Sequence, residues 1–365
     1  MKITGIIQFL ERIAPLSLQE SYDNAGLIVG NSEADCTGII TSLDVTESVV
    51  QEAVKRNCNL IVAHHPVIFR GIKKLNGKNY VERTIIAAIK NDIAIYAIHT
   101  NLDNLVEGVN KKIAEKIGLQ GCKTLLPKES TLQKLVTFSP VKNAEEVRMA
   151  LFNAGAGAIG KYDECSFNVE GSGTFKAGDG SHPFVGKVGT RHEETEVRIE
   201  VIFPSFLQKK IVRSLKESHP YEEVAYYIHA LENVQENVGS GLIGQLPHPV
   251  SEKELLEILK EEFKLSVIKH TPFLEKPVDK IAVCGGAGIF LLPNAIAADA
   301  QVYITSDIKY HEFFDADSRI FLTDIGHYES EQFTIELLTE LLQGEFSNFA
   351  VLKTEINTNP VKYFI

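Results

Sequence analysis

Short apolar segments that end abruptly in polar residues recur along the chain, and they constrain its fold more than any other feature. The segment 59–63 is followed by His64 and His65, and the segment 93–98 is followed by His99. Amphipathic helical patterns separate these segments. A strand without polar residues is buried on both faces, which is typical of a parallel sheet covered by helices. The pattern therefore predicts an α/β fold.

The last part of the chain repeats this alternation. Strands are expected at 279–284, 300–305 and 317–323, again separated or followed by helical patterns. The stretches CNLIVAHH and AQVYITSD occupy equivalent places in the two parts. The sequence therefore predicts a pseudo-duplicated α/β fold, with one half in residues 1–126 and the other in residues 237–365.

The middle of the chain, residues 127–236, has a different pattern. Its apolar periodicity indicates the order β-α-β-β-α-β, which is that of a ferredoxin-like α+β unit. The expected elements are strands at 134–138, 164–170, 194–203 and 224–231, and helices at 144–154 and 206–218. Long insertions into surface loops cost little free energy. We therefore expect an inserted domain.

Composition excludes several classes of protein. The 365 residues carry a formal net charge of −11, which argues against general binding of nucleic acid. The 5 cysteines are scattered without a C-x-x-C pair, a pattern typical of free thiols in a reducing compartment. The N-terminus reads as an amphipathic helix, and no apolar run approaches the roughly 18 residues of a membrane span. We expect a soluble cytoplasmic protein with no membrane partner.

Candidate ligands for metal ions gather where the predicted strands end, which is where open α/β sheets place their sites. These residues are His64, His65, His99, Asp103, His327 and Glu331. The last two stand four apart, so a helix would project both from one face, about 5–6 Å apart. Three histidines and two carboxylates can hold two divalent ions, with one carboxylate bridging them. Such donors suit Zn, Mn, Fe or Co, and a pair of these ions can activate water as a nucleophile.

Simpler structural explanations exist for each residue taken alone. A histidine at a strand end is more often structural, His99 can cap a turn or support a ligand, and a His–Glu pair on a helix is often only solvated. Residues 285–288 (GGAG) resemble a phosphate-binding loop but lack its spacing, so we interpret them as a tight turn near a substrate. Asp307 and His311 lie off the main cluster. Three coincident clusters nevertheless favour a metal site.

Several motifs in order resemble one family. They are YDNAGLIVG from Tyr22, AHHPVIFRG from Ala63, HTNLDN from His99, ITSDIKYHEFFDA from Ile304, and DIGHYESE from Asp324. Together they resemble the Nif-three-like family, also called type 2 GTP cyclohydrolase I homologues. The central segment resembles the insert of longer bacterial members, related to the ferredoxin-like PII and CutA proteins.

The resemblance implies a dinuclear metal site and an assembly. Its ligands would be His64, His65, Asp103, His327 and Glu331. Glu331 would bridge the ions, and His99 would lie close by, outside the ligand set. Family members form toroidal homohexamers whose metal sites face an internal cavity, and the insert is expected to cap the ring.

The family name implies an activity, hydrolytic opening of GTP at C8 with release of formate. The nucleophile would be a hydroxide generated by the metal ions. The general acid is not identified, and His99, Asp307 and His311 are the candidates. Two alternatives stay open: another metal-dependent hydrolase acting on a nucleotide or phosphoester, and a non-enzymatic metal-responsive regulator or scaffold that binds a small effector.

Overall fold

The computed structural model describes residues 1–364, which form two compact units. Unit 1 comprises residues 1–127 and 236–365, and unit 2 comprises residues 128–235. Each contains its own apolar core. Within the described residues, we find no helix with the length and apolar character needed to cross a bilayer.

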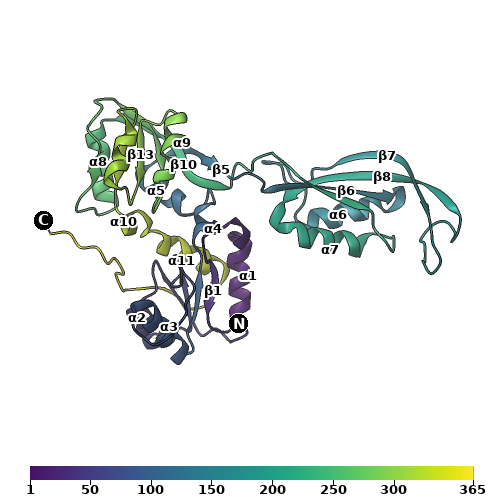
Figure 1. The fold of residues 1–365 in the computed structure, drawn as a ribbon, viewed down its shortest axis with the longest axis horizontal. Coiled ribbons are helices and arrows are strands. Elements are labelled where there is room, and N and C mark those ends of the chain that lie inside the picture. Colours follow the sequence, from purple (N-terminus) through teal and green to yellow (C-terminus); the bar gives the residue numbers. More distant parts are fainter. Residues whose placement is uncertain (365) are drawn as a thin grey trace. The chain divides into compact units, whose positions relative to one another are not determined.

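Unit 1 is built on two β-sheets with helices packed against them (Figure 1). One sheet has five strands in the order β1-β4-β3-β2-β15, and the other has six in the order β11-β14-β13-β12-β10-β5. The strands are β1 Gly26–Val29, β2 Ile39–Ser42, β3 Leu60–Ala63, β4 Ala94–Ala97, β5 Gln120–Pro127, β10 Gly239–Val250, β11 Lys269–His270, β12 Val278–Val283, β13 Val302–Thr305, β14 Phe321–Asp324 and β15 Val351–Lys353. The helices are α1 Ile3–Ile13, α2 Glu47–Lys55, α3 Tyr80–Lys90, α4 Thr100–Asp103, α5 Val109–Ile117, α8 Glu252–Glu262, α9 Leu292–Ala297, α10 His327–Glu331 and α11 Thr334–Glu345, with 3-10 turns at Leu16–Leu18, Ile289–Leu291 and Tyr310–Ala316.

The two sheets share a common parallel trio of strands. In one, β3 lies between β2 and β4, and in the other, β13 lies between β12 and β14. The predicted duplication and α/β class are confirmed, with CNLIVAHH and AQVYITSD on the two central strands. Ser42, Ala63 and Ala97 end their strands in register, so the residues that follow meet at one edge of the sheet.

The two sheets do not coincide with the two outer segments of the chain. Strand β15, near the C-terminus, pairs with β2, while β5 from the first segment pairs with β10. Helix α5 contributes Ile113 and Ile117 to the core of the second sheet, and α11 contributes Leu338 and Leu342 to that of the first. In Figure 1, α10 and α11 run between the sheets. This exchange joins the outer segments of the chain into one compact unit.

Unit 2 has the order β-α-β-β-α-β that the sequence predicts, with an antiparallel sheet in the order β7-β8-β6-β9. Its elements are β6 Leu132–Pro140, α6 Ala144–Ala154, β7 Phe167–Lys176, β8 Arg191–Pro204, α7 Gln208–Ser218 and β9 Tyr226–Ala230, with 3-10 turns at Val141–Asn143 and Ser205–Leu207. Helices α6 and α7 pack on one face of the sheet (Figure 1). The unit is therefore ferredoxin-like.

Two strand predictions have wrong boundaries. The strand expected at 317–323 begins only at Phe321, because residues 310–316 form a 3-10 turn and Asp317 and Ser318 have positive φ. Strand β7 extends to Lys176 through a glycine-rich stretch that looks like a turn. Gly173 suits the strand because any Cβ there would overlap the carboxylate of Glu196 on β8.

The two ends of unit 2 leave unit 1 at adjacent points, since Gly239 on β10 pairs with Pro127 on β5. Replacing residues 128–235 by a Gly/Ser linker of about five residues should therefore leave unit 1 folded. We expect a cooperative thermal transition and metal binding equal to that of the full chain, measured by circular dichroism and titration. Loss of cooperative unfolding would contradict the independence of unit 1.

Candidate metal centre

Four histidines of unit 1 use the Nδ1 atom to hold their rings in place. His64 Nδ1 lies 2.9 Å from the carbonyl oxygen of Ile98, and His65 Nδ1 lies 2.8 Å from Asp44 Oδ1. The same contact joins His99 to Asp23 (2.7 Å) and His327 to Asp307 (2.8 Å). A carbonyl or carboxylate oxygen accepts, so each Nδ1 carries the proton. This is the arrangement that presents Nε2 to a metal ion.

The carboxylate of Glu331 lies among these rings, with a side chain only 4% exposed. Its Oε2 atom is 2.9 Å from His65 Nε2 and 3.1 Å from His327 Nε2. Its Oε1 atom is 3.9 Å from His64 Nε2, which lies 3.6 Å from Asp103 Oδ1. The two oxygens of one carboxylate therefore face two different sets of donors, the geometry expected of a ligand that bridges two ions.

The set of atoms around His64 fits a cation. His64 is fully buried, and because its Nδ1 donates to a carbonyl, its neutral Nε2 is an acceptor that faces the carboxylate oxygens of Asp103 and Glu331. Among residues 1–364, neither His64 Nε2 nor Asp103 Oδ1 has a hydrogen-bond partner. Buried acceptors without a donor are costly, and a divalent ion would satisfy both. Nitrogen and oxygen donors without thiolate suit Zn, Mn, Fe or Co.

The pKa shifts within the cluster agree with this interpretation. Burial lowers the pKa of His64 to about 4. Burial and the neighbouring Glu331 carboxylate raise the pKa of Asp103 well above its usual value. Burial opposes the charged form of Glu331, but hydrogen bonds from His327 and His65 lower its pKa well below the usual value. His64 is thus neutral and Glu331 is ionised at neutral pH, which are the forms that bind a cation.

Two other groupings extend the cluster. Single donor atoms of His64, His65 and His99 lie within 4.8 Å of one another, as do those of His65, His327 and Glu331. The structure therefore brings His99 beside the five residues that the family resemblance gives as ligands. Either grouping could hold an ion, and the ligand assignment stays a prediction.

Asp23 fixes the position of His99. Its buried carboxylate accepts hydrogen bonds from His99 Nδ1 and from the Thr100 hydroxyl (2.5 Å) and backbone amide (3.0 Å). Burial alone would raise the pKa of Asp23, but the hydrogen bonds from His99 and Thr100 lower it to about 2. Asp23 is therefore ionised at neutral pH and orients the ring.

The other residues that the sequence suggested for the site lie in different positions relative to it. Asp307 holds His327 and does not reach the other ligands through any contact described for residues 1–364. His311 packs against the rings of Tyr310 and Phe314 and is not among the described residues that line the cavity. At the tight turn 285–288, a Cβ on Gly286, whose φ is +62°, would overlap Glu331 Oε1. That glycine makes room for the central carboxylate.

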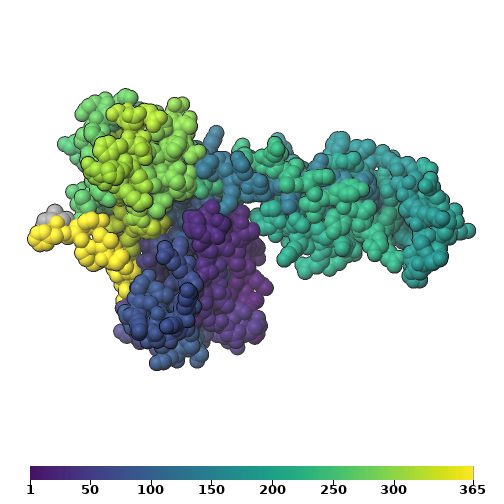
Figure 2. Space-filling model, in the orientation of Figure 1, coloured from purple at the N-terminus to yellow at the C-terminus, as the bar shows by residue number. Residues whose placement is uncertain are grey.

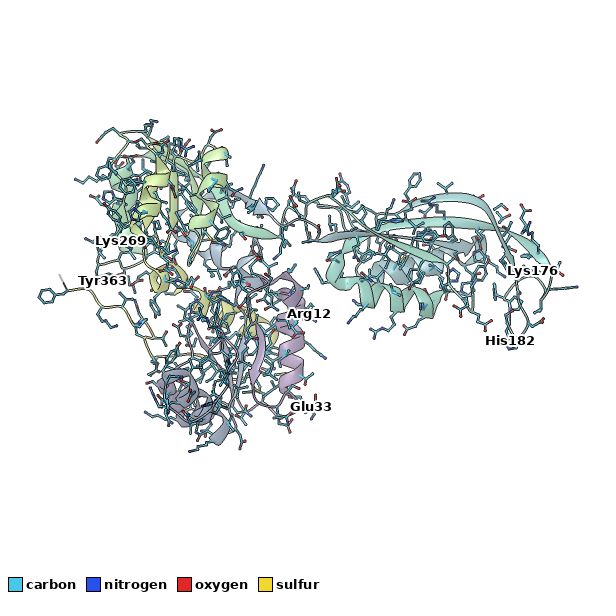
Figure 3. The ribbon with its side chains drawn as sticks, viewed as in Figure 1. Arg12, Glu33, Lys176, His182, Lys269 and Tyr363 are labelled. Carbon is cyan, nitrogen blue, oxygen red and sulfur yellow. The ribbon has the colours of Figure 1, made fainter. Side chains whose placement is uncertain are left out.

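The site opens into a cavity of 1380 Å³ that lies within unit 1. The residues after β15 run past it on the surface, yellow in Figure 2. There Thr358 Oγ1 donates to Asp44 Oδ2 (2.6 Å), and Asn359 Nδ2 donates to Glu329 Oε1 (2.8 Å). Further along, Tyr363 lies close to Lys269 in Figure 3. The C-terminal segment thus contacts Asp44, which holds His65, and Glu329, which lies two residues after His327 on α10.

Sequence reasoning missed Asp44, Asp23 and Thr358. Asp44 follows β2 as His64 follows β3, so the rule that polar residues at strand ends gather at one edge would have found it. Asp23 belongs to a motif quoted for the resemblance, but its pairing with His99 spans 76 positions. Thr358 lies in an irregular segment with no local signal, so only the folded chain reveals its role.

Asp44→Asn should weaken binding of one ion by about 10- to 100-fold, because it removes the charge that orients His65. Thr358→Val, which removes one hydrogen bond to Asp44, should have a smaller effect in the same direction. Titration with Zn²⁺ under competition with a chelator measures both. Asp299→Asn, at an exposed position, is the matched control. Unchanged affinity in Asp44→Asn would refute the positioning role.

Metal binding should release protons at pH 7. Burial would lower the pKa of His65, but hydrogen bonds to Asp44 and Glu331 raise it to about 9. Burial has the same effect on His327, and hydrogen bonds to Asp307 and Glu331 raise its pKa to about 11. Both rings are protonated without an ion and must lose a proton at Nε2 to bind one, so apparent affinity should rise with pH between 6 and 9. Calorimetry in buffers of different ionisation enthalpy counts the protons, and release of none would contradict this.

Comparison with known proteins places the chain in a family. The model of the family Duf34/NIF3 (NGG1p interacting factor 3) matches residues 1–360. The "GTP cyclohydrolase 1 type 2 homolog" of Halalkalibacterium halodurans is 37% identical, with 100% of both chains covered. The protein of the same name from Bacillus subtilis is 36% identical over 98% of this chain and 97% of that one. The crystal structure of a Bacillus cereus protein related to NIF3 is 36% identical, with a TM-score of 0.88 over 100% of this chain and 99% of that chain. The chain belongs to the Duf34/NIF3 family.

Proposed function

We propose that the protein is a dinuclear metal-dependent hydrolase that acts on a nucleotide. The observation that carries this proposal is the position of Glu331, whose two carboxylate oxygens face separate sets of histidine and aspartate donors. His64 and Asp103 would serve one ion, and His65 and His327 the other. A pair of divalent ions supplies Lewis acidity and an activated water at neutral pH. The names of the relatives point to GTP as the substrate.

The protein's own residues have distinct roles in this proposal. Asp44, Asp307 and the carbonyl of Ile98 fix which nitrogen of each histidine is free. His99 is held by Asp23 with its ring centre 5.2 Å from that of His64 and 5.4 Å from that of His65. We propose that His99 transfers a proton between the substrate and water, because Asp23 holds its ring beside His64 and His65 and the family resemblance leaves it outside the ligand set. His311 has no such place, and Asp307 is occupied by His327.

Three further expectations from the family resemblance stay proposals. We propose that unit 2 is a PII/CutA-like insert, supported by its strand order β7-β8-β6-β9. A toroidal homohexamer is the second. A cytoplasmic location is the third, supported by 5 cysteines that are all free.

Incubation of the Zn²⁺-loaded protein with GTP tests the activity. We expect formate and a fluorescent pteridine product, because water attacks C8 of the purine. Phosphate release without formate would show a phosphohydrolase instead. Absence of turnover on a nucleotide panel, combined with ligand-shifted melting, would indicate a metal-responsive regulator.

Glu331→Ala should remove both ions and the activity together. The loss of one carboxylate leaves each ion with fewer donors and leaves His65 and His327 without their common partner. Metal analysis and the formate assay measure the two effects. Glu257→Ala, on the exposed face of α8, is the control. Full metal occupancy in Glu331→Ala would rule out the bridging role.

A further inference from the structure

The loop that follows His65 carries three cations into the cavity. Residues 66–79 connect β3 to α3, and Arg70, Lys73 and Lys74 all line the cavity that holds the metal centre. All three are exposed, and none forms an ion pair or side-chain hydrogen bond within residues 1–364. Such a concentration of free positive charge is notable in a chain with a net charge of −11.

The loop is anchored to the first sheet, so its basic side chains lie on the side that faces the cavity. Val67 is buried, and Ile68 and Ile72 pack against the core of the first sheet. The carbonyl of Ile68 accepts a hydrogen bond from Asn24 Nδ2 (2.7 Å). At the far end, the carboxylate of Glu82 accepts from the amides of Asn76 and Lys78, both at 3.0 Å. Apolar residues hold the loop to the sheet, and the cations face the cavity.

Each acidic side chain that lines the same cavity has a hydrogen-bond or ion-pair partner or lies at the metal centre. Glu47 pairs with Arg83 at 2.8 Å, Glu82 holds the loop, and Asn104 donates to Glu20. Asp44 holds His65, and the other two, Asp103 and Glu331, lie at the metal centre. Away from the centre, the three cations of the loop equal the three acidic lining residues Glu20, Glu47 and Glu82 in number. Because the charge of Glu47 is balanced by Arg83, positive charge is in excess there and favours an anionic ligand.

Exposed aromatic rings line the same cavity as the cations. Phe69 is 51% exposed and its ring centre is 5.7 Å from that of His99. Tyr22 and Phe290 also line the cavity and are 63% and 58% exposed. Exposed aromatic faces in a concave site favour a flat ring, since stacking needs only a π-face. The cavity exceeds the roughly 300–1,000 Å³ of typical small-molecule sites.

We propose that Arg70, Lys73 and Lys74 form a subsite for the phosphate groups of a phosphorylated heteroaromatic substrate, whose ring stacks on Phe69 beside the metal centre. This inference rests on the proposed function and names the substrate class of the same site. It also assigns the orientation: the ring lies toward His99, and the phosphates lie along the loop. A bidentate Arg and two Lys charges are the groups that proteins use for phosphate.

Binding of guanosine, GMP, GTP and inorganic triphosphate to the Zn²⁺-loaded protein tests the subsite by calorimetry. Affinity should increase from guanosine to GMP to GTP and should fall as salt concentration rises. The triple variant Arg70→Gln/Lys73→Gln/Lys74→Gln should weaken GTP binding about 10- to 100-fold and leave guanosine binding unchanged. The control Lys90→Gln/Lys253→Gln/Lys260→Gln makes the same change in net charge away from the cavity and should bind GTP normally.

A second variant separates the ring from the phosphates. Phe69→Leu should weaken guanosine and GTP alike and leave inorganic triphosphate unaffected. Zinc content and melting temperature of the triple variant should equal those of the unmodified protein, because its three side chains are exposed and unpaired.

Three results would overturn the subsite: equal affinity for guanosine and GTP, GTP affinity retained in the triple variant, or a single-stranded oligonucleotide bound more tightly than GTP. Inorganic triphosphate bound as tightly as GTP would overturn the ring contact. These outcomes are separate from those of the activity assay. Charge-dependent GTP binding without formate would support the subsite and refute the proposed reaction. Formate production with an unchanged KM for GTP in the triple variant would support the proposed reaction and refute the subsite.

Discussion

The burial of the Glu331 carboxylate among histidines is the interaction on which the rest of the site depends. A buried carboxylate is costly unless it is hydrogen-bonded or binds a cation, and here His65 and His327 supply partners at 2.9 and 3.1 Å. Those rings must in turn be oriented, which requires Asp44 and Asp307 behind them. The buried charge of Glu331 therefore requires a series of hydrogen-bonded polar residues around it.

The fold provides this arrangement by combining elements from both parts of the chain. Helix α10 carries Glu331 and His327 to the edge of the first sheet, where His64 and His65 leave β3. The exchange of β5 and β15 between the sheets ties the two parts into one body, so the relative position of these side chains is set by shared cores. A site assembled from two independent lobes would lose this precision whenever the lobes moved.

Charge is divided within the cavity. Acidic residues lie at the metal centre or have partners, while Arg70, Lys73 and Lys74 are free on the loop after His65. The same loop thus begins at His65 and ends in a helix cap, with aromatic and basic residues between. Residues 66–79 therefore connect the histidine cluster directly with the basic side chains that line the cavity.

The sequence by itself determined the α/β class, the duplication, the ferredoxin-like insert and the strand ends where His64, His65, His99, Asp103, His327 and Glu331 lie. It could do so because apolar periodicity and strand termination are local properties. Tertiary structure alone decided which of these residues meet, that Asp23, Asp44 and Thr358 support them, and that His311 stands apart. Those contacts join residues up to 314 positions apart, as in the Asp44–Thr358 hydrogen bond, and no local pattern encodes such a distance.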